Sequence, residues 1–336
     1  MPVTFQRLCV LSLAASASLI STQVQASCGS TSCSINTDWN EHGASRPGWS
    51  TDFRYSYSRA DTLRSGSNKI VAEPTAAPYN AGIEAENLRT VNQLLTASLD
   101  YSHDEHWGVM LQLPYVMRDH SHSIGNADPA LVSTESFSAN SLGDIKVVGR
   151  YRRDTGMDNQ SGLGIKFGMK LDTGRKDFLL NTGALPGEAT LQPGNGSTDL
   201  ILGAFWTQNS PGSAWSWFTQ GTIQHSVSSG AQFRPGDQLN LDLGTRYAFS
   251  NALSGLLQLN AQWNDTDTGS AAALSPLNGE ASSGMKSVAI TPGVSYAFTP
   301  ATQLYSLLQL PVYQYVNGEQ LTASYTFSLG ISHHFF

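Results

Sequence analysis

The chain has 336 residues and a formal net charge of −7 at pH 7, and only 13% of its residues are charged. An ordinary soluble domain carries roughly 25% charged residues, so the chain is unusually poor in charge. The negative balance, with no basic stripe, argues against a nucleic-acid partner, because phosphate binding requires clustered Lys and Arg. Helix-forming patterns are nearly absent, whereas Gly, Ser, Thr, Asn and aromatic residues are abundant, which indicates an all-β chain.

Residues 1–26 have the features of a secretory signal peptide. Arg7 precedes an apolar run over 8–20, and small residues lead to Ala26. The run is too short, and too rich in Ser and Ala, to span a bilayer, which takes about 20 apolar residues. We therefore expect cleavage after Ala26, with lipidation of Cys28 as the weaker alternative.

Residues 27–47 are predicted to form a short periplasmic segment ahead of the folded domain. Cys28 and Cys33 are the two cysteines that remain after removal of the signal. In an oxidising compartment such a close pair favours a small disulfide loop. A soft-metal clip that adds His42 is the alternative, since thiolates bind Cu(I) and Zn²⁺.

Alternation of apolar and small or polar residues predicts about twelve β-strands, each long enough to cross a bilayer as a strand of about 9–11 residues. In 286–298, Val288 and Ile290 share one face, while Ser287 and Thr291 lie on the other. The predicted strands are 48–58, 90–102, 105–117, 141–153, 161–172, 197–208, 213–226, 237–249, 252–263, 286–298, 301–313 and 320–336.

The connections between these strands alternate in length. Short links such as 102–106 and 298–302 are followed by long ones such as 118–140 and 173–196. A soluble β-sandwich also alternates along its strands, but it has no reason to keep this parity. Short periplasmic turns and long outer loops are typical of outer-membrane barrels. We therefore predict that 48–336 form an antiparallel up-and-down transmembrane β-barrel in the bacterial outer membrane.

Such a barrel has a lipid face and a lumen face. Trp and Tyr lie mostly near the ends of the predicted strands, which indicates aromatic girdles at the headgroup level. Outer-membrane lipid and lipopolysaccharide are therefore the expected partners of the outer face.

Charged residues within the strands are predicted to point into the lumen, because a cation facing lipid at the midplane costs about 2–4 kcal/mol. An ion-paired plug and a pore biased toward anionic or polar solutes both fit this pattern. Lys146, Arg150, Lys166 and Lys170 form the expected electrostatic constriction. The full set is Arg54, Asp100, Asp144, Lys146, Arg150, Arg152, Lys166, Lys170, Asp172, Asp242 and Arg246.

The carboxyl terminus, YTFSLGISHHFF, resembles the signal by which the assembly machinery recognises outer-membrane barrels. The resemblance assigns this role to Phe335 and Phe336, although it is Phe335 that continues the apolar alternation.

Three internal segments, SLGDIKVVGRY (141–151), GMKLDTGRKD (168–177) and PGNGSTDLILGAFW (193–206), are similar to those of a transporter-like barrel family named for the meta-pathway of phenol degradation. The usual Leu-Pro-Thr-Gly of that family reads Leu-Asp-Thr-Gly here, at 171–174. The resemblance implies uptake of hydrophobic or aromatic compounds.

Catalysis and metal binding were weighed at three places. His225 lies in a strand, but the chain has no G-x-S-x-G and no His–Ser couple along one face. Asp265 and Asp267 lie beside a glycine but lack a further carboxylate at calcium-loop spacing. His120 and His122 share a face if extended, with no carboxylate or Cys fixed nearby in the sequence.

The sequence thus predicts a channel for passive or facilitated passage of small molecules, with a small-molecule solute as its partner. No catalytic residue, cofactor or metal is assigned. An outer-membrane enzyme of the lipase or deacylase type, and a structural barrel that presents its surface loops, remain as alternatives.

Overall fold

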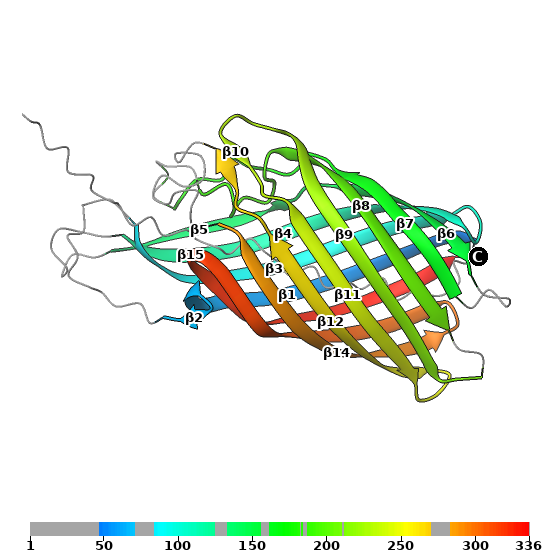
Figure 1. Cartoon of the computed structure of the whole chain (residues 1–336). Helices are drawn as coiled ribbons and strands as arrows, with labels where there is room; N and C mark the ends of the chain where they lie inside the picture. The colour runs from blue at the N-terminus through cyan, green and yellow to red at the C-terminus, as the bar shows by residue number, and fades with distance from the viewer. Residues whose placement is uncertain are drawn as a thin grey trace, which may run out of the picture.

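The structure is a computed structural model that describes residues 47–70, 84–124, 133–155, 161–181, 183, 187–209, 212–269 and 283–335. Its strands form an elongated barrel with inclined strands (Figure 1). No helix in the described part of the chain is long and apolar enough to cross a membrane.

The long strands follow one another around the barrel in chain order (Figure 1). The strands are β1 (Gly48–Gly66), β2 (Asn68–Lys69), β3 (Glu84–Ser102), β4 (Trp107–Ile124), β5 (Ser133–Leu142), β6 (Lys146–Asp154), β7 (Ser161–Lys170), β8 (Ser197–Asn209), β9 (Trp215–Ser229), β10 (Phe233–Arg234), β11 (Gln238–Ala248), β12 (Leu253–Asn264), β13 (Thr268–Gly269), β14 (Met285–Thr299) and β15 (Thr302–Phe335). The short β2 pairs with β1, and the short β10 and β13 form a separate two-stranded sheet.

The wall closes where β15 pairs with β1, from Trp49 opposite Phe335 to Gly66 opposite Val316. Closure leaves no strand edge exposed to hydrocarbon, where unpaired backbone groups would cost several kcal/mol each. This seam explains why the apolar alternation of the sequence continues to its end. Phe335 has a 45% exposed side chain on the outer face of the seam.

β15 counts as two passes of the wall. Its first half pairs with β14 and its second half with β1, both antiparallel. Between them Gly318 has φ 61°, a turn conformation that favours glycine, and Gln314 donates to the carbonyl of Ala323 at 2.9 Å across the hairpin. Eleven labelled strands form the closed ring, so the hairpin gives twelve passes. An even number is required for a ring that is antiparallel throughout, and the predicted count is confirmed.

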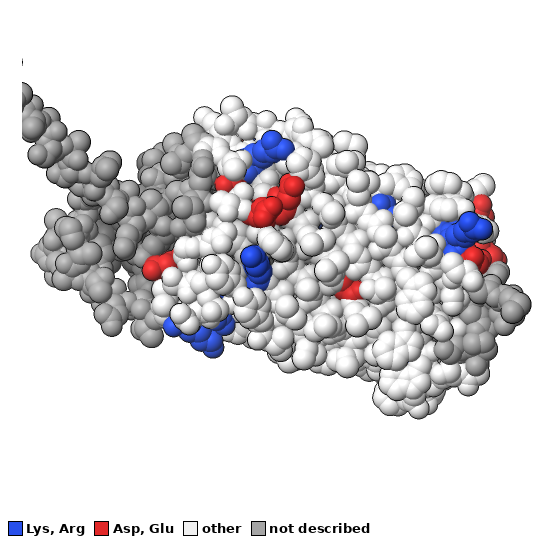
Figure 2. All heavy atoms as spheres, viewed as in Figure 1, with Lys and Arg blue, Asp and Glu red and all other residues white. Residues whose placement is uncertain are grey.

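Side chains alternate between lipid and lumen as predicted. In β7, Leu163, Ile165 and Phe167 are exposed on the outside, whereas Lys166 and Lys170 are buried on the inside. Figure 2 shows that the middle of the visible wall is largely uncharged, with Lys and Arg gathered mainly toward its two ends. An apolar band of this kind is what the hydrocarbon layer requires.

One aromatic girdle lies at the end of the barrel that carries the short turns. The rings of Trp107 and Tyr151 pack in a tilted arrangement with centroids 4.6 Å apart, and those of Trp215 and Tyr247 with centroids 4.7 Å apart. Both pairs flank short connections, so these amphipathic rings mark the periplasmic headgroup level.

Several strands extend further outward than the sequence predicts. β1 continues to Gly66, β4 continues to Ile124, and β5 lies in a segment expected to be a loop. Beyond the membrane both faces of a strand can be polar, so apolar alternation fades although the backbone pairing continues. The predicted strand 141–153 is also interrupted: β5 and β6 are separate segments that pair with β4 on either side of a break at 143–145.

The signal peptide, the 27–47 segment up to residue 46, Cys28, Cys33 and Phe336 lie outside the described residues. The predicted cleavage, the disulfide and the role of Phe336 therefore stay predictions.

Replacement of an outward leucine by arginine tests the orientation of the wall. Leu243→Arg in β11 should lower the free energy of unfolding by about 2–4 kcal/mol, because Leu243 faces lipid with its side chain 49% exposed. Asn240→Arg in the same strand should cost much less, since Asn240 lines an internal cavity. Urea unfolding in lipid vesicles, followed by tryptophan fluorescence, gives both values, and equal costs would contradict the assignment of faces.

Candidate functional site

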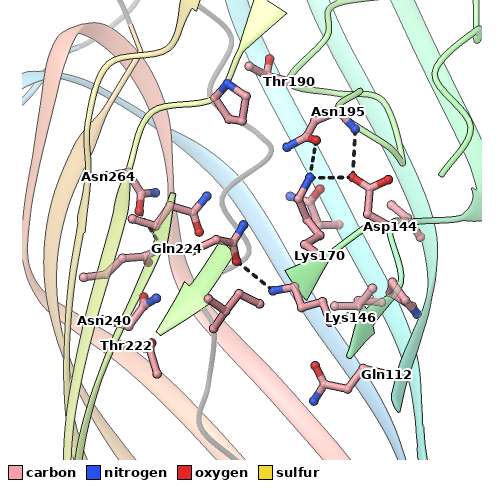
Figure 3. Close-up of a pocket in the computed structure, with 18 of the residues that line it drawn as sticks. Gln112, Asp144, Lys146, Lys170, Thr190, Asn195, Thr222, Gln224, Asn240 and Asn264 are labelled. Atoms are coloured by element: carbon pink, nitrogen blue, oxygen red, sulfur yellow. Dashed lines mark hydrogen bonds and ion pairs between the residues drawn. The ribbon is translucent and has the colours of Figure 1, made fainter. Parts of the chain in front are cut away.

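A cavity of about 430 Å³ occupies the lumen and is lined by side chains from most of the wall. Its lining includes cations from β1, β6 and β7, amides from β9, β11 and β12, and apolar side chains from β4, β6 and β8. Figure 3 shows Lys146 and Lys170 on one side and Gln224, Asn240 and Asn264 on the other. The outer loop between β7 and β8 is called here the docking loop, and its described residues are 171–181, 183 and 187–196. Residues from 189 to 195 of this loop line part of the cavity. The cavity is therefore both charged and apolar.

The cationic side of the cavity contains Arg54, Lys146 and Lys166. Lys146 Nζ donates to Gln224 Oε1 at 3.4 Å, and Lys166 Nζ donates to Gln220 Oε1 at 3.2 Å. Both acceptors are amide oxygens of β9, so these hydrogen bonds orient the two ammonium groups toward that strand. Figure 3 shows Lys146 reaching toward Gln224.

An apolar strip runs beside these cations. Met110 of β4, Val148 of β6 and Ile201 of β8 form a buried cluster, and all three line the cavity. Amides of β11 and β12, among them Asn240 and Asn264, face the cavity from other strands (Figure 3). A solute inside would meet hydrogen-bond donors, positive charge and an apolar surface together.

Asp144 anchors the docking loop to the wall. The break between β5 and β6 frees its carboxylate to accept from the backbone N–H groups of Gly174 at 2.9 Å and Thr173 at 3.2 Å. Lys170 Nζ donates to it at 3.0 Å, and Asn195 N–H donates at 3.2 Å. Figure 3 shows Asp144, Lys170 and Asn195 converging at one point. We call this set of contacts the Asp144 node.

The three sequence segments that carry the family resemblance meet at this node. Asp144 belongs to the first, Lys170 and Gly174 to the second, and Asn195 to the third. Gly174 and Gly194 pack backbone against backbone: a Cβ on Gly194 would lie 2.5 Å from Gly174 atoms. Only glycine allows this approach, which explains why both segments contain it.

Lys170 was expected to contribute its charge to the constriction, but its ammonium group is closely paired with carboxylates. In addition to Asp144 it contacts Asp199 Oδ2 at 3.3 Å and Asn195 Oδ1 at 2.5 Å, and its side chain is 5% exposed. It therefore contributes to the docking of the loop. Lys146, Lys166 and Arg54 are the other predicted cations that line the cavity.

Other predicted lumen charges lie nearer the periplasmic end and do not line the cavity. Arg150 binds Asp100 with both terminal nitrogens, at 2.8 Å for Nη2 to Oδ1, and it also donates to Ser102 Oγ at 2.6 Å. This buried bidentate ion pair links β6 to β3. Arg150 thus belongs to an ion-paired layer and not to the cationic side of the cavity.

Three further predicted charges lie either in this ion-paired layer or on the amide side of the cavity. Arg152 is 2% exposed and its Nη1 lies 2.8 Å from Asp154 Oδ1. Arg246 Nε donates to Ser254 Oγ at 2.9 Å. Asp242 lines the cavity and accepts from the amide nitrogens of Asn260 at 2.7 Å and of Gln220 at 2.9 Å.

The prediction that Asp172 points into the lumen is wrong. β7 ends at Lys170, so the alternation no longer applies at Asp172, whose exposed carboxylate binds Lys176 Nζ at 2.6 Å on the docking loop.

The charged cavity residues that the sequence did not predict, among them Arg118 and Asp267, fall in segments predicted to be loops. Arg118 is 6% exposed, and it donates to Asn92 Oδ1 at 2.5 Å and to the carbonyl of Thr190 at 3.0 Å. Asp267 accepts from the backbone N–H of Gly236 at 2.8 Å. A polar outer strand end gives no alternation signal, so neither side chain could be assigned to the lumen.

The side chains weighed for catalysis and calcium binding have other contacts. His225 is exposed, as its place on the lipid face predicts, with Nδ1 2.7 Å from Asp237 Oδ1 and Nε2 3.4 Å from Arg234 Nη2. Asp265 accepts from the indole of Trp263 at 3.0 Å. His120 and His122, expected to lie without a nearby carboxylate, are in fact beside Glu188 of the docking loop. The fold brings that residue there from a distant part of the sequence.

The closed antiparallel wall, the apolar outer band and the polar lumen define the class: a β-barrel of the bacterial outer membrane. A family described as "Putative MetA-pathway of phenol degradation" matches residues 64–331, and the chain belongs to that family. No curated protein matches the chain in sequence.

Solved structures of outer-membrane barrels share the fold. An outer membrane channel from Pseudomonas putida F1 aligns with a TM-score of 0.61 and 12% identity, covering 88% of this chain and 98% of that one. The P. putida toluene transporter TodX aligns with a TM-score of 0.44 and 9% identity, covering 87% and 91% of the two chains. Identities this low show the fold alone.

Removal of the carboxylate at the Asp144 node should release the docking loop. Asp144→Ala leaves the buried ammonium of Lys170 short of one charge partner, which should lower the free energy of unfolding by about 3 kcal/mol, and trypsin should cut at Arg175 or Lys176. Asp172→Ala is the matched control, because its exposed ion pair contributes about 0–1 kcal/mol. Urea unfolding and limited proteolysis test both variants; similar behaviour of the two would contradict the anchoring role.

The outer end of the cavity should respond to pH through Asp267. Burial raises the pKa of this carboxyl from 3.8 to about 6, against the hydrogen bond from Gly236. The folded state therefore binds the proton more tightly than the unfolded state. This contribution to stability should be fully present below pH 3.8 and lost as the pH rises through about 6. Unfolding of the wild type and of Asp267→Asn at several pH values measures it, and identical pH profiles would exclude the shift.

Proposed function

We propose that the barrel is an outer-membrane channel for the passive passage of small amphipathic anions, in which an aromatic or aliphatic group carries a carboxylate. The observation that carries this proposal is the composition of the cavity, where Lys146 and Lys166 lie next to the apolar strip of Met110, Val148 and Ile201. A purely polar pore would need no apolar strip, and a route for neutral hydrocarbons alone would need no buried ammonium groups.

The size of the cavity supports a small solute. Pockets of about 300–1,000 Å³ hold drug-sized molecules, so a cavity of about 430 Å³ accommodates a single aromatic ring with a short acidic side chain. The family description, which names phenol degradation, agrees with an aromatic solute. It does not select a particular compound.

The passage mechanism follows from electrostatics in a low-dielectric wall. The ammonium groups of Lys146 and Lys166, oriented by the amides of Gln224 and Gln220, attract anions and so raise their local concentration. The carboxylate would interact in turn with Lys146 and Lys166, while the apolar part follows the strip beside them. Amides such as Gln220 and Gln224 replace part of the hydration shell, so binding stays weak enough for release.

The enzyme alternative gains no support from the best candidate side chain. Both ring nitrogens of His225 face charged groups, Asp237 on one side and Arg234 on the other. A general base for a serine nucleophile needs one ring nitrogen directed at the hydroxyl. We therefore propose a channel that works without covalent chemistry.

Assembly and membrane context form part of this proposal. Phe335 lies at the closing seam opposite Trp49, on the outer face. Its position supports recognition of the terminal strand by the barrel-assembly machinery before closure. The apolar outer band supports lipid contact throughout and lipopolysaccharide contact at the outer end.

Neutralising the cationic side of the cavity tests the proposed selectivity. In planar bilayers the double variant Lys146→Gln/Lys166→Gln should lose anion selectivity, and benzoate flux into proteoliposomes should fall about tenfold, because the field that concentrates anions is removed. Arg59→Gln is the control: Arg59 is an exposed cation paired with Asp61 at 2.8 Å outside the cavity. Unchanged benzoate flux in the double variant would contradict the anionic channel, and retained flux of neutral toluene in both variants would show that the pore is intact.

A further inference from the structure

Two histidines of the outer part of β4 and one glutamate of the docking loop form a compact buried group. One ligand atom from each of His120, His122 and Glu188 lies within 4.8 Å of the other two. The side chains are only 2%, 1% and 4% exposed, respectively. The two histidines share the inner face because strand residues two apart point the same way. The glutamate comes from a segment more than sixty residues later in the chain.

The spacing of the two imidazoles suits one metal ion. His120 Nε2 and His122 Nδ1 are 3.3 Å apart. For metal–nitrogen bonds of about 2.0–2.1 Å at a tetrahedral angle, two nitrogens on one Zn²⁺ are separated by about 3.3 Å. The observed distance thus equals the separation that a shared tetrahedral ion requires. A direct imidazole–imidazole hydrogen bond at this distance would be long.

A hydroxyl on β3 sets the orientation that His120 needs as a ligand. Thr90 Oγ1 lies 2.8 Å from His120 Nδ1, so Nδ1–H can donate to it while the Nε2 lone pair faces His122. Metal-binding histidines characteristically use their second ring nitrogen in this way. On the loop side, the Thr190 hydroxyl donates to Glu188 Oε2 at 3.4 Å, which orients the carboxylate.

From this geometry we infer a metal site, with His120, His122 and Glu188 as ligands for a divalent ion of the Zn²⁺ class. Two imidazoles and one carboxylate are a common ligand set for zinc and leave a fourth position for water. Glu188 supplies one negative charge, which offsets the cation of Arg118 two residues before His120 on the same strand face. The ion would fasten the docking loop to β4, and this attachment is separate from the Asp144 node.

Zinc binding to the full mature barrel, purified in detergent without a polyhistidine tag and stripped with chelator, tests this site. Calorimetric titration with ZnCl₂ should give one ion per chain. His120→Ala and His122→Ala should each abolish that binding. Thr90→Val should weaken it about tenfold, as loss of an outer hydrogen bond to a ligand does. Co²⁺ in place of Zn²⁺ should give the intense visible absorption of a tetrahedral complex in the wild type, and this absorption should be absent from His120→Ala and His122→Ala.

His225→Ala is the matched control, because His225 is an exposed histidine with its own carboxylate partner, Asp237, and this variant should bind zinc normally. Glu188→Gln preserves the size of the side chain but removes its charge, so this variant should weaken zinc binding. It tests the site even if a histidine variant fails to fold, as judged by loss of the heat-modifiable band of a folded barrel. Retention of full zinc affinity in Glu188→Gln and Thr90→Val, absence of stoichiometric binding in the wild type, or equal loss in His225→Ala would each overturn the assignment.

Discussion

Closure of the backbone hydrogen-bond ladder is the constraint on which the rest of the structure depends. Hydrocarbon offers no partner to an open strand edge, so β15 must return to β1 and the number of passes must be even. Once the ring is closed, the two-residue period of each strand divides all wall side chains between lipid and lumen. The apolar band, the girdles and the charged interior follow from that division.

The same division explains how charge can be placed inside a membrane protein at moderate cost. Inward cations meet carboxylates in the ion-paired layer, as in Arg150 with Asp100, or meet amides in the cavity, as in Lys146 with Gln224. The first arrangement ties strands together and cancels charge. The second directs an ammonium group into the cavity. Strand alternation gives both kinds of cation the same sequence pattern, so the partner, which comes from a strand that is not adjacent in the wall, decides which function results.

The sequence was sufficient to predict the barrel and its approximate strand number, because lipid imposes a strict local pattern. The sequence was not sufficient to place side chains beyond the membrane-spanning parts of the strands, where the lipid constraint ends. Asp172 follows the last residue of β7, and Arg118 lies in an outer strand extension, so alternation placed the first wrongly and missed the second. The contact between Glu188 and His120 shows the general difficulty. It forms because a loop docks against the wall, and no periodic pattern in the sequence predicts such a contact.

The docking loop therefore determines what the lumen becomes. It is attached by the Asp144 node, by the hydrogen bond from Arg118 to the Thr190 carbonyl, and by packing of Leu180 and Leu191 against Phe137 of β5. These attachments use different interactions and different strands, so loss of one leaves the others to hold the segment. A barrel of twelve passes is too wide to be filled by wall side chains as an eight-stranded one is, and narrower than an open porin. At this intermediate width a firmly attached loop, more than the strand number, sets the shape and the charge of the path.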